Sequence, residues 1–249
     1  MIIKRIVMAM ILLLGLVHSV NAGIERAARE VTVFYAGMAQ ELSSLRGGIF
    51  SNAITSALLG EADTNKDGIL SQNEFSIYVR VDTKNKSKRK QVVRVVNPWL
   101  DAEAPICGKV TYVLAIGINY THTKNPLQYA VSDARNIASS LQKQCKDVNI
   151  ISYTDNLATK NGIIDAINNI KSQVHYDDNI IVSFSGYGVE INGKNYIIPN
   201  NASVANLANM EREAIRVSEL IEILTASRTK HALLLIDTNF RTIKNNKTR

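Results

Sequence analysis

The sequence predicts an α/β fold with a mostly parallel sheet that helices cover on both faces. The first observation is a series of continuous apolar segments, of which residues 110–118 (VTYVLAIGI) are a strong example. The second is that amphipathic helical segments alternate with them, as in residues 130–143. Fully apolar strands separated by such helices are typical of a parallel sheet between two helix layers. An N-terminal strand and a helix-loop-helix unit precede this alternation.

The first half of the chain combines strands with a helical pair. Residues 31–36 (VTVFYA) are rich in β-branched and aromatic side chains, which favours a strand. Further along we expect a helix over 49–61, a turn-rich loop over 63–74, a second helix over 75–81 and a β-rich piece over 91–96.

The second half repeats a strand-helix pattern after a short linker. We divide the mature chain into segments 23–100 and 108–249, joined by a linker at 101–107. The expected strands are 110–118, 148–153, 179–184 and 231–236, with a short extension at 196–198. The expected helices are 130–143, 159–173 and 218–224.

The N-terminus has the layout of a cleavable secretory signal. Lys4 and Arg5 form a positive start, residues 6–17 are apolar, and Val20 and Ala22 are small residues where a signal peptidase cuts. This apolar run is shorter than the roughly 20 residues that a membrane span needs. We therefore expect residues 1–22 to be removed, giving a secreted or periplasmic protein that is not held in a membrane.

Positive charge gathers in two places, residues 84–90 (KNKSKRK) and 241–249, within a formal net charge of +7. No aromatic side chains are interleaved with the first run, as a stacking surface for nucleic acid would require. We expect a solvated loop there and no nucleic-acid partner.

Residues 63–74 (DTNKDGILSQNE) fit the EF-hand calcium loop at each constrained position. The expected Ca²⁺ ligands all supply oxygen: Asp63, Asn65, Asp67, the carbonyl of Ile69, a water held by Ser71, and both carboxylate oxygens of Glu74. Gly68 allows the sharp reversal of the loop. The alternative is an Asp-Gly turn that binds no ion. The second EF-hand that usually pairs with such a loop is missing, which predicts modest affinity.

Three segments of the second half resemble the caspase and metacaspase domain, a family of cysteine endopeptidases. Residues 113–120 (VLAIGINY) with 127–134 (LQYAVSDA) resemble its first strand and the loop and helix that follow. Residues 178–188 (DNIIVSFSGYG) resemble its strand ending in Ser-Gly-His-Gly, and residues 231–240 (HALLLIDTNF) its strand ending in Asp-Ala-Cys-His. The resemblance implies a caspase-like fold.

The same resemblance implies a His/Cys dyad at the ends of two neighbouring strands, where this chain has Tyr187 and Asn239. A phenol, with a reference pKa of about 10, is a poor base at neutral pH. A carboxamide cannot form an acyl-enzyme, and the members of a dyad act as a unit. We therefore predict that the protein is not a working peptidase.

Other candidates for the missing chemistry are weak. Ser185 and Thr238 are close to the two positions, but a hydroxyl without a base is inert by default. His122 follows the first strand of the α/β half, at the correct edge of the sheet, and we expect it to be a solvated loop residue. Cys107 precedes that strand and Cys145 follows its helix, so both belong at the opposite edge. We expect them to form a disulfide.

The N-terminal segment resembles the opposite end of the same family. Residues 31–36, 47–50 and 58–79 resemble the strand, helix start and loop that follow the nucleophile in bacterial caspase-like proteins, and residues 91–98 resemble the closing segment. The family's C-terminal part thus precedes its N-terminal part. Either the chain is a circular permutant, with residues 31–36 beside 231–236, or it joins the end of one domain to the start of another.

The sequence therefore predicts an exported caspase-like homologue that binds Ca²⁺ and presents its former substrate cleft to a peptide or protein partner. Two alternatives remain open. One is an active cysteine endopeptidase completed by a partner chain or by an unrecognised nucleophile. The other is a degenerate fragment whose only role is calcium binding.

Overall fold

The computed structural model describes residues 30–36, 48–203, 207–238 and 240–243. The expected signal segment, residues 1–22, and Asn239 lie outside these ranges. The main sheet has six strands in the order β2-β1-β9-β5-β3-β4. Their bounds are β1 Glu30–Tyr35, β2 Arg94–Val96, β3 Thr111–Gly117, β4 Val148–Thr154, β5 Asn179–Ser185 and β9 His231–Asp237. Among these strands only β2 pairs in the antiparallel direction, so the prediction of a mostly parallel sheet is confirmed.

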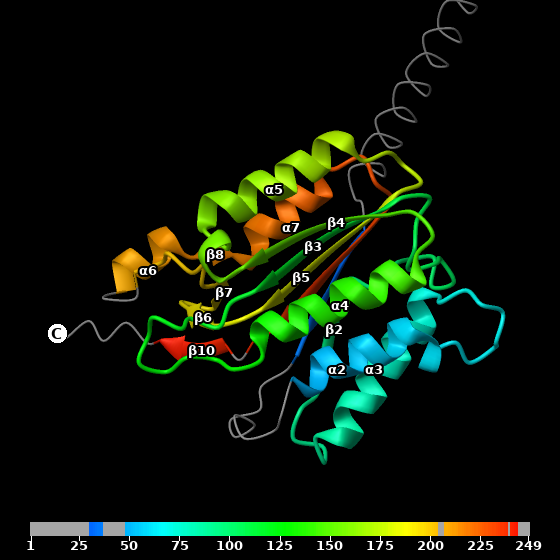
Figure 1. Ribbon diagram of the computed structural model, residues 1–249, viewed down its shortest axis with the longest axis horizontal. Coiled ribbons are helices and arrows are strands. Elements are labelled where there is room, and N and C mark those ends of the chain that lie inside the picture. The colour runs from blue at the N-terminus through cyan, green and yellow to red at the C-terminus, as the bar shows by residue number, and fades with distance from the viewer. Residues whose placement is uncertain (1–29, 37–47, 204–206, 239, 244–249) are drawn as a thin grey trace, which may run out of the picture.

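Helices cover both faces of this sheet, as Figure 1 shows. One face carries α5 and α7, and the other carries α2, α3 and α4. The bounds are α2 Ile49–Ser56, α3 Gln72–Lys86, α4 Ala130–Gln144, α5 Lys160–Gln173 and α7 Val217–Thr225. A π-helical turn, η2 Ala57–Glu61, extends α2, and a 3₁₀ turn, η3 Asp155–Leu157, follows β4. Of the described residues, none forms a helix with both the length and the apolarity to cross a bilayer.

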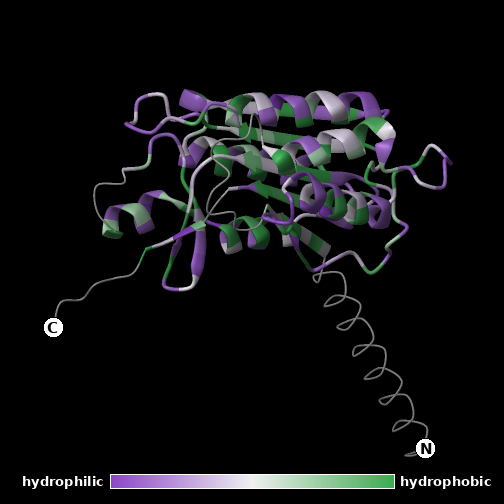
Figure 2. Ribbon diagram, turned by 90° about the horizontal axis from the view of Figure 1, so that it is seen from below, coloured by the Kyte–Doolittle hydropathy of each residue, from purple (hydrophilic) through white to green (hydrophobic). Residues whose placement is uncertain are grey.

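The two faces of the sheet bury separate apolar cores because alternate residues of a strand point to opposite sides. Leu114 and Ile116 of β3 pack on the side of α5 and α7, with Ile163 and Leu220. Val113 and Ala115 pack on the side of α2, α3 and α4. In Figure 2 the strands are mostly apolar, while polar residues gather on the outer surfaces of the helices. This pattern explains why the strand sequences are apolar on both faces.

The N-terminal strand β1 lies inside the sheet, between β9 and β2. It runs parallel to β9, with Val31 opposite Ala232 and Tyr35 opposite Ile236. On its other side it pairs with β2 in the antiparallel direction. Residues 31–36 and 231–236 of one chain therefore lie side by side, which is the pairing that a permuted arrangement requires.

A second sheet continues from the end of β5 and was only partly expected from the sequence. Its four strands have the order β10-β6-β7-β8. Their bounds are β6 Gly188–Ile191, β7 Lys194–Ile197, β8 Ile215–Arg216 and β10 Phe240–Ile243. The hairpin between β6 and β7 turns at Asn192 and Gly193, which both have positive φ. Helix α6 (Leu207–Glu213) precedes β8 and was not predicted.

Candidate functional site

The carboxyl ends of β3, β5 and β9 meet at one edge of the main sheet. Ser185, the last residue of β5, is opposite Gly117 of β3 and Asp237 of β9. Tyr187 follows Ser185 after one glycine, and Thr238 follows Asp237. This is the edge where open α/β sheets place their ligands and chemistry. The structure thus brings the segment of Tyr187 next to the strand that leads to Asn239.

Tyr187 holds a loop in place. Its ring packs against that of Tyr120, with centroids 4.7 Å apart. Its backbone N–H donates a hydrogen bond to the Tyr120 hydroxyl over 3.1 Å. Its own hydroxyl donates to the backbone carbonyl of Asn125. The phenol proton is therefore engaged with the loop that follows β3, and the side chain is not arranged as a proton acceptor.

Three other candidate side chains end or follow these strands. Ser185 and Thr238 are both buried, each with 7% of its surface exposed. Thr238 packs against Gly188, where an added Cβ would come within 2.8 Å of the threonine hydroxyl. His122 is exposed on the loop after β3, as the sequence predicts.

Two buried carboxyl groups lie at the same edge. Asp133, in the first turn of α4, and Asp237, at the end of β9, are covered by the start of α2. The Gly48 N–H donates to Asp133 Oδ2 over 3.3 Å, and the Ser51 hydroxyl donates to Asp237 Oδ2. A Cβ at Gly48 would come within 2.6 Å of Asp237 Oδ2, so glycine permits this close approach.

The shared environment disfavours ionisation of both carboxyl groups. Burial raises the pKa of Asp133, and the neighbouring charge of Asp237 raises it further, to about 7. Burial likewise raises the pKa of Asp237, against the effect of the Ser51 hydrogen bonds. Two close carboxyl groups in one site are expected to compete for a proton. The pair is suited to hold a proton or to receive a cationic group.

We did not identify this pair as a site from the sequence. Both residues belong to the segments that carry the family resemblance, LQYAVSDA and HALLLIDTNF. Their position toward the ends of these two segments was the only hint in the sequence that they belong to a site. Their burial depends on α2, and Ser51 and Asp237 are separated by 186 residues.

We expect Asp133→Asn to reduce the pH dependence of stability. The pKa of Asp133 is raised in the folded protein from 3.8 to about 7, so the folded state binds the proton more tightly than the unfolded state. The free energy of unfolding therefore falls as the pH rises from about 4 to about 7. Asparagine cannot ionise, so at pH 8 the variant should be more stable than the wild type by about 1–4 kcal/mol.

Urea unfolding at pH 4, 6 and 8 measures this difference. Asp165→Asn, at an exposed position on α5, is the matched control and should keep the wild-type pH dependence. The same pH dependence of the free energy of unfolding in Asp133→Asn and the wild type would contradict the raised pKa of Asp133.

The EF-hand-like loop, residues 63–74, lies between η2 and α3 and includes the first turn of α3. Its reversal uses positive φ at Lys66 and Gly68, and Glu74 lies in the first turn of α3. Asp63 Oδ2 accepts the Gly68 N–H over 3.0 Å, and Asp67 Oδ1 accepts the Ile69 N–H over 2.8 Å. The aspartates are therefore turned into the loop.

Glu74 is bound to its own loop. Its Oε1 accepts from Thr64 and its Oε2 accepts from Ser71, completing a capping box at the start of α3. Burial raises the pKa of Glu74, but these hydrogen bonds outweigh it and lower the pKa to about 2. The carboxylate is therefore ionised at neutral pH. Within the described ranges, no three His, Cys, Asp or Glu side chains come together as a metal site.

The donor set nevertheless fits calcium. Asp63 Oδ1 is buried and has no hydrogen-bond partner in the described part of the chain. A buried carboxylate oxygen without a partner is costly, and a cation would satisfy it. The carboxylates and carbonyls of this loop are the hard oxygen ligands that Ca²⁺ prefers.

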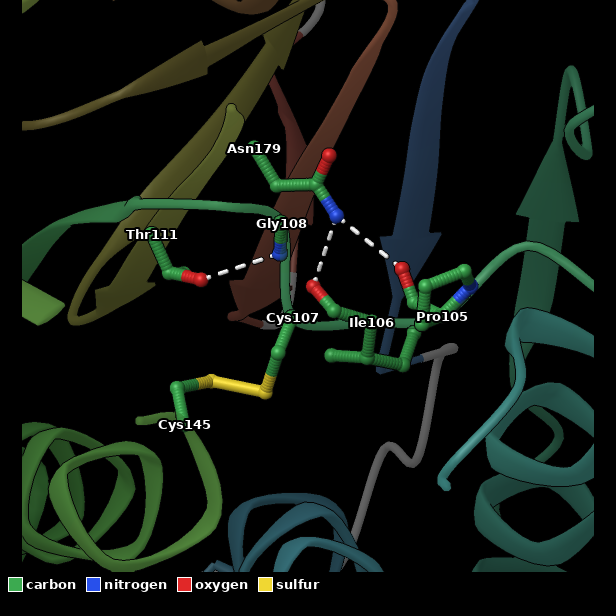
Figure 3. The surroundings of a disulfide bond; sticks show 7 residues. All are labelled: Pro105, Ile106, Cys107, Gly108, Thr111, Cys145 and Asn179. Atoms are coloured by element: carbon green, nitrogen blue, oxygen red, sulfur yellow. Dashed lines mark hydrogen bonds between the residues drawn. A yellow bond between two sulfur atoms is a disulfide. The ribbon is translucent and has the colours of Figure 1, made fainter. Parts of the chain in front are cut away.

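At the opposite edge of the sheet, a disulfide joins Cys107 to Cys145 (Figure 3). Cys145 ends α4, and Cys107 precedes β3. The sequence contains two cysteines, so the disulfide uses both. No thiol remains at the edge that carries Tyr187.

Comparisons with known proteins show the family to which the chain belongs. The family model described as the caspase domain matches residues 110–247, which include β3, β5, Tyr187 and β9. No curated protein matches the chain. A solved structure of a protein from Geobacter sulfurreducens matches with 18% identity and a TM-score of 0.42. That match covers 52% of this chain, which spans about half, 50%, of the other. Because the family model covers more than half of the sequence, the chain belongs to the caspase-domain family.

Proposed function

We propose that the protein is an exported, proteolytically inactive caspase-like homologue that binds calcium. The observation that carries the proposal is the position of Tyr187 and the hydrogen bond that its hydroxyl makes. It occupies the position at which the family has its histidine, and its hydroxyl is committed to the carbonyl of Asn125. A general base must be free to accept the proton of the nucleophile, and this side chain donates its own proton to the loop.

The cysteine chemistry of the family also lacks a nucleophile here. Asn239 is at the position of the catalytic cysteine, and an amide side chain cannot form a thioester. Cys107 and Cys145 cannot substitute, because they are joined to each other at the opposite edge. Among the described residues, the buried Thr238 hydroxyl has no hydrogen-bond partner, so no base activates it there.

A binding role is consistent with the groups that remain. Asp133 and Asp237 would complement a basic side chain of a peptide or partner protein. Both carboxyl groups are covered by the first turn of α2, so such a side chain reaches them only if α2 shifts. Because these two carboxyl groups would complement a basic side chain, the proposed partner is a peptide or protein that carries one.

Calcium is the ligand that the loop at residues 63–74 supports best. The unpartnered Asp63 Oδ1, the ionised Glu74 and the loop reversal at Gly68 all agree with the EF-hand pattern. The ion would be held by oxygen atoms of six residues of the loop, Asp63, Asn65, Asp67, Ile69, Ser71 and Glu74. Bound calcium would neutralise the carboxylates and fix α2 and α3 at the two ends of the loop.

Export is supported by two features. The first residues have the layout of a secretory signal. The Cys107–Cys145 disulfide is typical of proteins from oxidising compartments. Extracellular and periplasmic proteins can use calcium sites of modest affinity.

Calcium is expected to raise the melting temperature of the purified protein, measured by calorimetry in CaCl₂ and in a chelator. At a concentration of about 100 times Kd, binding adds about 2.7 kcal/mol, which corresponds to roughly 5–10 °C for a chain of this size. Glu74→Gln should remove most of this shift, because calcium needs the charged carboxylate at the last position of the loop. Glutamine can still complete the capping box, so the fold should persist.

Glu222→Gln is the matched control. It removes the same charge from an exposed position on α7, on the opposite face of the sheet, and it should keep the calcium response. Equal melting temperatures of the wild type in calcium and in chelator would rule out the site.

A further inference from the structure

A short extended segment takes the place beside the calcium loop that a second EF-hand usually fills. The Ile106 N–H donates to the Leu70 carbonyl over 2.9 Å, and the Gln72 N–H donates to the Ala104 carbonyl over 2.9 Å. Ser71 and Pro105 form an isolated antiparallel bridge between these two bonds. Ser71 is itself an expected ligand, and Leu70 and Gln72, which make the two hydrogen bonds, lie on either side of it in the loop. The segment 104–106 thus fixes the half of the loop that precedes α3.

The segment is anchored on one side by the disulfide. Cys107 follows Ile106 directly and is joined to Cys145 at the end of α4. Ile106 is fully buried in the core that also contains Leu70 of the loop and Leu141 of α4. The disulfide therefore ties the strand beside the calcium loop to the helix that packs against the same core.

On the other side the segment is held by one side chain, as Figure 3 shows. The amide of Asn179, the first residue of β5, donates to the carbonyls of Pro105 and Ile106 over 3.0 and 2.9 Å. The two anchors act differently. The asparagine holds the segment to the main sheet, and the disulfide holds it to α4.

We propose that the Cys107–Cys145 disulfide sets the calcium affinity of the loop by holding residues 104–106 against it. This inference rests on the proposed calcium site. With the disulfide intact, the Leu70–Gln72 stretch is ordered before the ion binds, so binding costs less conformational entropy. Without it, only the Asn179 hydrogen bonds and the burial of Ile106 hold the segment, so ion binding must supply more of its ordering. Because the coupling is reciprocal, bound calcium protects the disulfide from reduction by the same factor.

Isothermal titration with CaCl₂ tests the coupling on the oxidised wild type and on Cys107→Ala/Cys145→Ala. The double variant is expected to bind calcium about 10-fold more weakly. Leu224→Ala is the matched control, because it removes a buried side chain of α7 on the opposite face of the sheet. It destabilises the protein without touching the loop and should leave Kd unchanged. Equal loss of affinity in this control would assign the effect to global destabilisation and overturn the proposal.

A second measurement uses the wild type alone and does not depend on the folding of the variant. A dithiol reductant such as dithiothreitol converts the Cys107–Cys145 bond to two thiols and is itself oxidised to a cyclic disulfide, a two-electron exchange. Saturating calcium should shift this equilibrium toward the oxidised protein by about 10-fold. A redox equilibrium that calcium leaves unchanged, or equal Kd values with and without the cysteines, would overturn the coupling.

The proposed calcium site fails in a different way. In that case the oxidised wild type gives no heat of binding and no rise in melting temperature. Calcium binding that is equal in all variants retains the site and removes only the role of the disulfide.

Discussion

Peptide substrates ending in arginine or lysine are expected to remain uncleaved by the purified protein, in calcium and in chelator alike. The proposal is that Tyr187 and Asn239 replace both members of the family's dyad. Loss of one member of such a unit typically lowers kcat by a factor of about 10⁴–10⁶. Release of a fluorophore from short peptides, followed over hours against a buffer blank, measures the rate, and a rate above the blank would contradict the expectation.

Neither single reversion should restore turnover. Tyr187→His supplies a base without a nucleophile, and Asn239→Cys supplies a thiol without a base. Tyr187→His also removes the hydroxyl that binds the Asn125 carbonyl, so its folding should be checked by circular dichroism. Hydrolysis by the wild type that depends on calcium and persists in Cys107→Ala/Cys145→Ala would show an unrecognised nucleophile and contradict the proposal.

Removing the disulfide is expected to cost about 3–4 kcal/mol of unfolding free energy. The bond closes a loop with a sequence separation of 38 residues, and the chain-entropy relation for a loop of this length gives a value in that range. Urea unfolding of Cys107→Ala/Cys145→Ala against the oxidised wild type measures it. Dithiothreitol should destabilise the wild type by a similar amount and leave the variant unchanged. A reductant effect of equal size on both proteins would show that the disulfide is not its cause.

The parallel sheet was predictable because the sequence of each strand alone indicates a strand that is buried on both faces. Segments such as residues 110–118 are apolar on both faces, and the helices between them have a clear 3.6-residue period. The hairpin of β6 and β7 was missed although a signal was present. Asn192-Gly193 is a pair that readily adopts positive φ at both residues, as a type I′ hairpin turn requires.

The length of α3 was underestimated for a physical reason. The basic run at residues 84–90 was expected to be a loop, but α3 continues to Lys86. Lysine is a good helix former, and the Asp82–Lys86 ion pair, with 2.8 Å between Nζ and Oδ2, has the spacing that favours helices. Charge alone indicated solvent exposure and did not indicate the end of the helix.

The candidate site was predictable only in part. The Tyr187 and Asn239 positions follow from motif order, and the residues of the proposed calcium loop follow from a local pattern. The Asp133–Asp237 pair depends on α2 covering two elements that are remote in sequence. The contact of residues 104–106 with the loop likewise depends on tertiary packing, since the same residues were expected to be a linker.

The place of β1 has a consequence for biosynthesis. Val31 pairs with Ala232, about 200 residues later in the chain. At a synthesis rate of about 5–20 residues per second, roughly 10–40 seconds pass between the two. During that interval the first strand has no parallel neighbour, and its backbone edge can pair with other chains. β1 therefore takes its place between β9 and β2 only after β9 has been made, and until then its edge is open to pairing with other chains.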